Sequence, residues 1–436
     1  MSAFLASVAT GQSADSTSLT RAEAARRAPD VSGDSGSGAP RRRLAAADSQ
    51  VSAAPSWDIN VRSYETRDRV AHYVGVFSGR AREPFIEWLE RGSRFEPLIR
   101  AQLKAGGLPE DMYFLALVES GFNPNAYSRA AAVGMWQFMT GTGRSMGLRI
   151  DWWVDERRDP VKSTTAAVRF IRDLRDQFGS LYLAAAAYNG GPGRVARGLV
   201  RYADDLEGVQ GEDAFFLLAE KDYLRNETRD YVPQLIAAAL IAKDPARYGV
   251  AYQPRPAFAY DSVAVRGGLP LAAVAKATRA SIGDLQELNP HLLRGMTPPG
   301  DSSRIRIPLG AAAGFDMSLA ALSDEERSGT KTVHSRAGET LKGVSRAHGV
   351  SEAAIRSFNP RLRRLKSGRL AAGQEILIPA PAVAAASLDV PDPSIERYPK
   401  RAKHKKKGHG SHIKRQSTSR QHHTSRKALR TKKRAR

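Results

Sequence analysis

The sequence predicts a mainly α-helical domain, then two small α+β modules with the order βααβ, with disordered segments at both ends. Apolar residues recur at helical spacing from about residue 58 to 249. One segment of the C-terminal half occurs twice, which indicates a duplicated module. The two ends are polar and lack any sustained period, as is typical of disorder.

The helical region begins near residue 58. Within it, Phe85, Trp88 and Leu89 recur at helical spacing. Gly106 and Gly107 end one predicted helix, and Pro109 suits the first turn of the next. Ala-rich and apolar helical patterns continue over 161–178, 181–188 and 229–243.

The repeat appears when the sequence is shifted by 70 positions, which places 263–290 on 333–360. Each copy predicts a short strand, two short helices and a final strand. The matched pairs include Asn289 with Asn359 and, after a slip of one residue, Ile307 with Ile378. The first copy is the more degenerate of the two.

These patterns predict six segments along the chain. They are a disordered or export segment at 1–57, a helical domain with an N-terminal extension at 58–250, a degenerate module at 258–310, a linker at 311–330, a second module at 331–381, and a linker with a basic disordered tail at 382–436.

Cysteine and histidine usage restricts the chemistry. The chain has no cysteine, which excludes disulfides, thiolate metal sites, thiol nucleophiles and a lipid-modified cysteine. All nine histidines lie outside residues 73–290, so this stretch, which holds most of the helical domain, has no histidine base or histidine metal site. An enzyme of this kind must use carboxylates, lysine or tyrosine, and glycosidic bond cleavage is the main reaction that a carboxylic acid can run. No cofactor and no metal are expected.

The charge of the chain is concentrated in its tail. Residues 397–436 hold 17 Lys or Arg and no Asp or Glu, which leaves +5 of the net +22 for the rest. The tail is predicted to be either a solvated disordered segment or an adhesive one that binds anionic envelope polymers or lipid headgroups. Charge alone also permits nucleic-acid binding, but no other feature supports it. No transmembrane segment, lipobox or clear signal peptide is predicted.

One carboxylate stands out. Met112, Leu115 and Ala116 define an apolar helical stripe, and Glu119 falls on the same stripe near a predicted helix end. Burial there would raise the pKa of the carboxyl, as a general acid at neutral pH requires. The alternative is a glutamate that turns to solvent or pairs with an arginine.

Four motifs occur in a fixed order around this glutamate. They are Glu119-Ser120, Gly134-Met135-Trp136-Gln137, Ala187-Tyr188-Asn189, and Tyr231 within the run ETRDYV at 227–232; a run DERRDP also stands at 155–160. Together they resemble the lytic transglycosylase family with the lysozyme-like fold, of the membrane-bound lytic murein transglycosylase D type. The repeated module resembles LysM. The chain departs from the family pattern at Met135, where Leu is commoner, and at Thr140, where Pro is commoner.

The resemblance implies an activity on peptidoglycan. Glu119 would first protonate the glycosidic oxygen after N-acetylmuramic acid and then, as the base, activate that sugar's own 6-hydroxyl, leaving a 1,6-anhydro end. A separate acidic run at Asp155, Glu156 and Asp159 is interleaved with arginines and is interpreted as a structural ion-pair cluster.

The other motif residues take supporting roles by the same resemblance. The substrate-binding set is Ser120, Met135, Gln137, Tyr188, Asn189 and Tyr231. Trp136 and Phe138 are expected in the core. The LysM-like modules would bind glycan strands, and the protein would be a monomer of the cell envelope, in the periplasm, with membrane association as a further option. Two alternatives stay open: a hydrolytic lysozyme-type muramidase, which needs a second carboxylate near Glu119, and an inactive peptidoglycan-binding protein.

Overall fold

The computed structural model describes residue 59 and residues 61–300 and 302–395. The predictions for 1–57 and for the basic tail at 397–436 therefore lie outside the described residues. All described residues belong to one of the two compact units into which the chain divides. Within that unit, helices dominate and two antiparallel two-stranded sheets follow, so the predicted fold class is confirmed.

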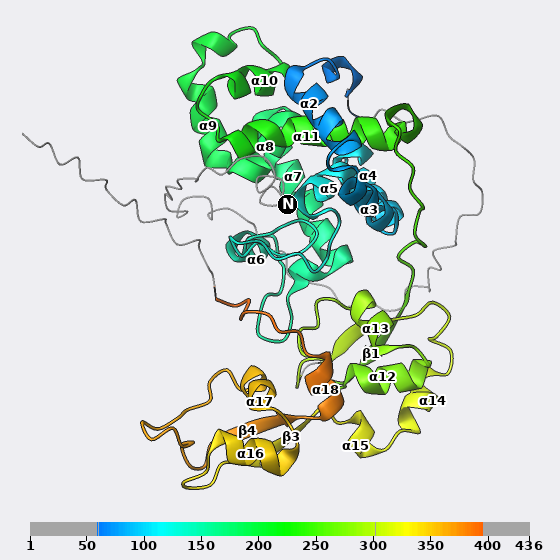
Figure 1. The fold of residues 1–436 in the computed structure, drawn as a ribbon, viewed down its shortest axis with the longest axis vertical. Helices are drawn as coiled ribbons and strands as arrows, with labels where there is room; N and C mark the ends of the chain where they lie inside the picture. Colours follow the sequence, from blue (N-terminus) through cyan, green and yellow to red (C-terminus); the bar gives the residue numbers. More distant parts are fainter. Residues whose placement is uncertain (1–58, 60, 301, 396–436) are drawn as a thin grey trace, which may run out of the picture. The chain divides into compact units, whose positions relative to one another are not determined.

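The helical domain occupies the N-terminal part of the described chain (Figure 1). Its core is one continuous cluster of buried apolar side chains that runs from Ile59 to Leu288. Its α-helices are α2 (Asp68–Ser78), α3 (Arg82–Ser93), α4 (Glu96–Ala105), α5 (Phe114–Ser120), α6 (Thr140–Ser145), α7 (Pro160–Phe178), α8 (Leu181–Gly190), α9 (Pro192–Arg201), α10 (Asp213–Glu220) and α11 (Asn226–Lys243).

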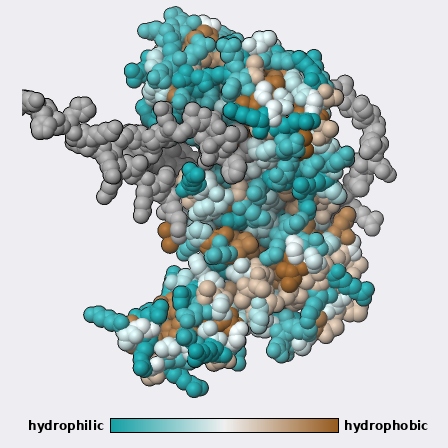
Figure 2. Space-filling view, viewed as in Figure 1, coloured by the Kyte–Doolittle hydropathy of each residue, from teal (hydrophilic) through white to brown (hydrophobic). Residues whose placement is uncertain are grey.

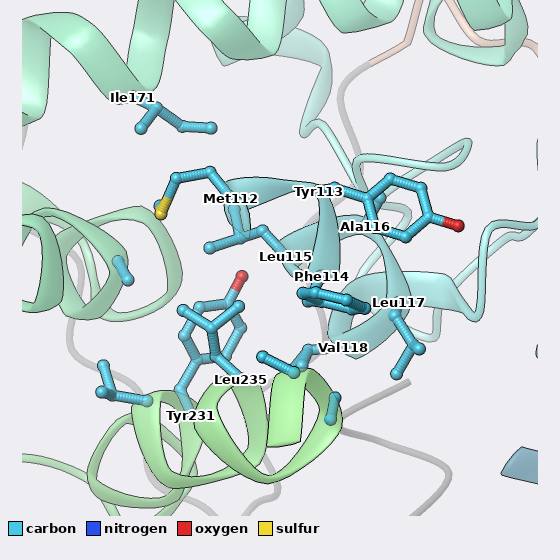
Figure 3. Close-up of a cluster of buried hydrophobic side chains, with 14 of the residues drawn as sticks. Met112, Tyr113, Phe114, Leu115, Ala116, Leu117, Val118, Ile171, Tyr231 and Leu235 are labelled. Carbon is cyan, nitrogen blue, oxygen red and sulfur yellow. The ribbon is translucent and has the colours of Figure 1, made fainter. Parts of the chain in front are cut away.

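Helix α5 is buried on every side. All of its residues are buried, and a 3₁₀ turn at Glu110–Tyr113 leads into it. A helix that is apolar all round is stable only inside a core. Figure 3 shows how its side chains lie beside Ile171 of α7 and beside Tyr231 and Leu235 of α11. The core therefore holds the helix that ends in Glu119 from several directions.

Each module of the C-terminal half has the predicted order of strand, two helices and strand. The first consists of β1 (Asp261–Val265), α12 (Leu271–Thr278), α13 (Ile282–Leu288) and β2 (Ser303–Ile307), and the second of β3 (Thr330–His334), α16 (Leu341–His348), α17 (Glu352–Phe358) and β4 (Glu375–Pro379). The helices of the two copies differ by the 70 positions that the repeat predicts. The strands pair antiparallel in equivalent registers, with Asp261 opposite Ile307 and Lys331 opposite Ile378.

The same asparagine closes both modules. Asn289 donates through Nδ2 to the carbonyl of Arg306 at 2.7 Å and accepts from the backbone N–H of Arg306 at 2.8 Å. Asn359 makes the same two bonds with Leu377, at 2.7 and 2.9 Å. A buried asparagine that bonds both backbone groups of a strand residue fixes the loop before that strand. This pairing also shows that Arg306 and Leu377 are equivalent positions.

The stretch between the modules, expected to be a linker at 311–330, contains two short helices, α14 (Phe315–Ala320) and α15 (Asp324–Arg327). Phe315 accounts for the difference, because it is buried in the core of the first module. The segment expected to start the C-terminal linker begins with helix α18 (Pro381–Ala386), which buries Val383.

The face of the described residues that Figure 2 shows is mainly hydrophilic. On the face in Figure 2, hydrophobic residues lie in separate groups among hydrophilic ones. Of the helices in the described ranges, none combines the length and the apolar character that a membrane crossing requires. Scattered exposed side chains such as Val200 and Met317 are ordinary for a folded surface.

Candidate active site

Glu119 lies in the last turn of α5, one residue before its end. Gly121 ends the helix in the left-handed conformation, with φ of 58°, which glycine adopts without strain. The side chain of Glu119 is 8% exposed. Burial disfavours the charged carboxylate and raises the pKa of Glu119, while the hydrogen bond from Tyr231 lowers it. Burial is the larger effect, and the pKa is about 7. Near neutral pH the group can therefore both give and accept a proton.

Tyr231 of α11 supplies the hydrogen bond to this carboxyl. Its hydroxyl donates to Oε1 of Glu119 at 2.5 Å across 112 residues of sequence. Burial and the neighbouring charge of Glu119 hold the pKa of Tyr231 well above its ordinary value, so the hydroxyl keeps its proton and stays a donor. The bond fixes one carboxyl oxygen and favours the charged form of the acid.

A tight loop brings Gln137 to the same region. Gly134 has φ of 84°, and a Cβ at this position would lie 1.8 Å from the carbonyl oxygen of Arg157, so only glycine fits. Gln137 itself has φ of 49°, an uncommon conformation for a residue with a side chain. Its Nε2 donates back to the carbonyl of Gly134 at 2.8 Å. The loop thus holds Gln137, half-buried, in a conformation that its own propensity does not favour.

Ser120, at the end of α5, is hydrogen-bonded to this loop. Its hydroxyl donates to the carbonyl of Met135 at 2.8 Å and accepts from the backbone N–H of Asn123 at 3.1 Å. The Met135 side chain is 0% exposed, so the structure does not place it where a substrate could touch it. The predicted contact of Met135 with substrate is replaced by a packing role, because the apolar side chain fills the core and only its carbonyl is used.

Helix α8 contributes Tyr188 and Asn189 at its C-terminal end. The hydroxyl of Tyr188 donates to the carbonyl of Trp136 at 2.8 Å, and burial, then the charge of Glu119, raises its pKa well above the ordinary value. Oδ1 of Asn189 accepts from the hydroxyl of Thr228 on α11 at 2.9 Å. No hydrogen bond from the amide nitrogen of Asn189 accompanies this one within the described residues, so the nitrogen keeps its capacity to donate.

The acidic run at 155–159 forms ion pairs, as its interleaved charges predict. Asp155 binds Arg157 through two bonds of 2.8 Å, and Glu156 pairs with Lys162. The Arg157 guanidinium also donates to the carbonyl of Phe138 and to the hydroxyl of Thr140, both at 3.1 Å. Thr140, a departure from the resembled pattern, is thus a partner of this buried arginine.

Glu227 is a site neighbour that the sequence reasoning did not single out, although it lies within the last motif. It stands exposed in the first turn of α11, one helical turn before Tyr231. Its charge raises the pKa of both Glu119 and Tyr231. The spacing of four residues from Tyr231 was the available signal, since residues four apart share a helix face.

Trp136 and Phe138, expected in the core, are both buried. Trp136 donates through Nε1 to the hydroxyl of Thr164 on α7 at 3.0 Å. The loop is therefore connected to α7 as well as to α5 and α8. Glu119, Gln137, Tyr188 and Asn189 come from three separate elements around this loop.

Comparison with known proteins places three family models on this chain. Residues 96–206 match the transglycosylase SLT domain, residues 259–324 match the LysM-like domain of lytic transglycosylase MltD, and residues 336–379 match the LysM domain. The first match contains Glu119, Gln137 and Asn189. The other two correspond to the two copies of the repeat.

Relatives include membrane-bound lytic murein transglycosylase D of Escherichia coli, which is 30% identical over 312 residues, or 68% of this chain and 64% of that protein. Membrane-bound lytic murein transglycosylase C of Glaesserella parasuis is 32% identical over 121 residues, covering 24% and 33% of the two chains. The chain thus spans less than two thirds of the length of these relatives.

Among solved structures, an inactive mutant of the lytic transglycosylase Slt from Pseudomonas aeruginosa shares 25% identity, covering 37% of this chain and 25% of that one, with a TM-score of 0.28. The 70 kDa soluble lytic transglycosylase of Escherichia coli shares 21% identity, covering 44% and 31%, with a TM-score of 0.30. The family matches show that the protein carries a transglycosylase SLT domain, an MltD-type LysM-like domain and a LysM domain. The similarity over 68% of this chain shows that it is homologous to membrane-bound lytic murein transglycosylase D.

Proposed function

We propose that this protein is a peptidoglycan lytic transglycosylase that cleaves the β-1,4 bond between N-acetylmuramic acid and N-acetylglucosamine without water. The observation that supports this most is the Glu119 carboxyl, which is buried, has a pKa of about 7, and receives a hydrogen bond from Tyr231. An acid with a pKa near the working pH can give a proton in one step and take one in the next.

In the first step, Glu119 gives its proton to the glycosidic oxygen, and the bond to C1 of N-acetylmuramic acid breaks with the electron pair going to that oxygen. The carboxylate then removes the proton of the 6-hydroxyl of the same sugar, whose oxygen attacks C1. The Tyr231 hydrogen bond stabilises the carboxylate between the steps. The product is a 1,6-anhydro end, and Glu119 regains its proton.

Gln137 and Asn189 are the donors proposed to hold the substrate. Both side chains are half-buried, and the Asn189 amide nitrogen is oriented by the bond from Thr228 to its carbonyl end. Amide groups suit the N-acetyl substituents of both sugars. Tyr188 is proposed to shape the wall beside them, and Ser120 to hold the loop rather than the substrate.

The modules and the basic tail are proposed to keep the enzyme on its substrate. A weak glycan-binding module joined to a catalytic domain raises the local substrate concentration. The tail at 397–436 has the composition that binds anionic polymers or lipid headgroups. A monomer in the cell envelope, in the periplasm, fits this activity.

A hydrolytic muramidase is the second candidate, and Glu227 is the observation that favours it. A water-using mechanism needs a second carboxylate, and Glu227 is close enough to raise the pKa of Glu119. Its exposed position one turn before Tyr231 leaves room for water. The two mechanisms give different products, because only hydrolysis creates a reducing end.

Mass spectrometry of the products released from purified peptidoglycan tests the proposal. We expect 1,6-anhydro muropeptides from the wild-type protein and none from Glu119→Gln. The matched control is Glu83→Gln, at an exposed position of α3, which should release the same products as the wild type. Reducing ends lost in both Glu119→Gln and Glu227→Gln would establish the hydrolase instead. Equal product from wild type and Glu119→Gln would refute the role of Glu119.

A further inference from the structure

The first LysM-like module is joined to the helical domain by buried contacts. The loop between α13 and β2 is buried continuously over 288–298, whereas the equivalent loop of the second copy is exposed over most of 360–369. Val154 of the helical domain lies in the core of the first module and forms a bridge with Leu292. Two copies of one module thus use the same loop differently.

A buried arginine marks the centre of this junction. Nη2 of Arg306 donates to Oδ1 and Oδ2 of Asp159, both at 2.8 Å, across 147 residues of sequence. Nη1 donates to the carbonyl of Leu288 at 3.2 Å, and the guanidinium lies 5.0 Å from the ring centre of Tyr260. The second copy has Leu377 at the equivalent position. The charge of Arg306 is therefore specific to the first copy.

Asp159 connects this arginine to the loop of the candidate active site. Its side chain accepts from the N–H groups of Val161 and Lys162 and so caps α7. In the next turn, Thr164 accepts the bond from Trp136, whose carbonyl in turn accepts from Tyr188. The position of α7 is thereby linked to the residue next to Gln137.

A second route leads from the module to the same loop. The carbonyl of His291 accepts from the N–H of Asp155 at 3.0 Å. Asp155 holds Arg157, which donates to the carbonyls of Ala131 and Phe138 on either side of Gln137. Both routes end on residues 131–140.

We propose that Arg306 is a positioning residue for catalysis, and that the first LysM-like module is part of the catalytic scaffold rather than a free glycan-binding module. This inference rests on the proposed function for its kinetic consequence. The module acts through Asp159 and Asp155 on the loop that carries Gln137. Misplacement of a positioned group by about 1 Å lowers a rate by up to about 100-fold.

The test compares three variants of the full chain on soluble glycan strands. Arg306→Leu installs the residue of the second copy and removes the arginine partner of the buried Asp159, which keeps the N–H groups of α7 and His291, whose Nδ1 lies 3.2 Å from its Oδ2. The double variant Asp159→Asn with Arg306→Leu removes the charge of that carboxylate and keeps a side chain that caps helices well. Arg304→Leu, two residues away on the exposed side of β2, is the matched control.

We expect the first two variants to lose about tenfold or more in kcat with little change in KM, and the control to keep both. A positioning role predicts that the double variant regains thermal stability but not kcat. Recovery of kcat along with stability, or a change in KM alone, would overturn the proposal.

Hydrogen exchange separates this inference from the proposed function. The amides of Val133 and Gln137 bond to carbonyls within the loop, so both should exchange faster in Arg306→Leu and in the double variant, and not in Arg304→Leu. If the wild-type chain cleaves no glycan, the proposed function fails while the exchange data still decide the connection. Faster exchange confined to residues 259–310 would refute the connection between Arg306 and the loop that carries Gln137.

Discussion

Replacing Glu119 by glutamine should stabilise the folded protein at neutral pH while it abolishes activity. The pKa of Glu119 in the folded chain is about 7 against an ordinary value of 4.5. The raised pKa means that folding favours the protonated acid, so the contribution of this group to stability is fully present below pH 4.5 and is lost as the pH rises through 7. A glutamine does not titrate and avoids this loss.

The magnitude follows from the size of the shift. A difference of about 2.5 pKa units corresponds to about 3 kcal/mol in the free energy of unfolding, at about 1.4 kcal/mol per unit. For a domain of this size, about 1 kcal/mol moves the melting temperature by about 2–4 °C, so the full effect is about 6–12 °C. The neutral amide keeps an oxygen that can accept from Tyr231, so the hydrogen bond is retained.

The assay is thermal unfolding of wild type and Glu119→Gln at pH 4 and at pH 8. We expect the two proteins to be separated by several degrees more at pH 8 than at pH 4. Glu83→Gln, on the exposed surface of α3, should change the free energy of unfolding by no more than about 0.5 kcal/mol at either pH. An equal stabilisation of Glu119→Gln at both pH values would show that burial does not raise the pKa of this carboxyl.

Three further predictions concern the neighbours of Glu119. Tyr231→Phe removes a hydrogen bond to the charged carboxylate worth about 1.5–3 kcal/mol, which raises the pKa of Glu119. The fall of kcat/KM at high pH should therefore shift to higher pH by about one pH unit or more; no shift would contradict the assigned bond. Gly134→Ala places a Cβ against the carbonyl of Arg157, so circular dichroism should show a large loss of stability, and a normal melting temperature would refute the required conformation. Glu227→Gln removes a charge that raises the pKa of Glu119, so the fall of kcat/KM at high pH should move to lower pH, still with 1,6-anhydro products; reducing ends in the wild type that vanish in this variant would favour hydrolysis.

The position of Glu119 could be predicted because one helical stripe carries it. An apolar face that includes a single carboxylate indicates burial without any knowledge of the partners, and the structure buries the whole helix. The bond from Tyr231 could not be predicted from spacing, because 112 residues separate the two side chains and no local pattern links them. Only the resemblance to a family associated Tyr231 with Glu119.

The duplicated module could also be predicted, with its order of strand, two helices and strand, because two copies of a sequence report the same local structure. The helices at 311–330 were missed because each is only one or two turns long; Phe315 of α14 is buried in the core of the first module, and Glu326 of α15 pairs with Lys276. Such short helices depend on tertiary packing rather than on their own propensity. The burial of Met135 was likewise not evident from its motif, because tertiary packing rather than local sequence buries it.

The junction at Arg306 was the least predictable feature. In β2, Arg304 and Arg306 are both arginines on alternate positions, which predicts the same exposed face of a strand. The structure exposes Arg304 and buries Arg306 against Asp159. The difference arises outside the module, because a buried carboxylate needs a cationic partner and the cap of α7 supplies that carboxylate.

Duplication of a module explains how such a junction can arise without loss of the fold. The asparagine bonds that close each copy use only the backbone of Arg306 and of Leu377, so the side chain at this position is free to differ. In the second copy a leucine is compatible with a loop that stays exposed, and in the first an arginine pairs with Asp159. Because a buried arginine is costly without its partner, this substitution is stable only where the helical domain covers it. The side chain at one strand position therefore distinguishes the copy that is fixed to the catalytic domain from the copy that keeps an open surface.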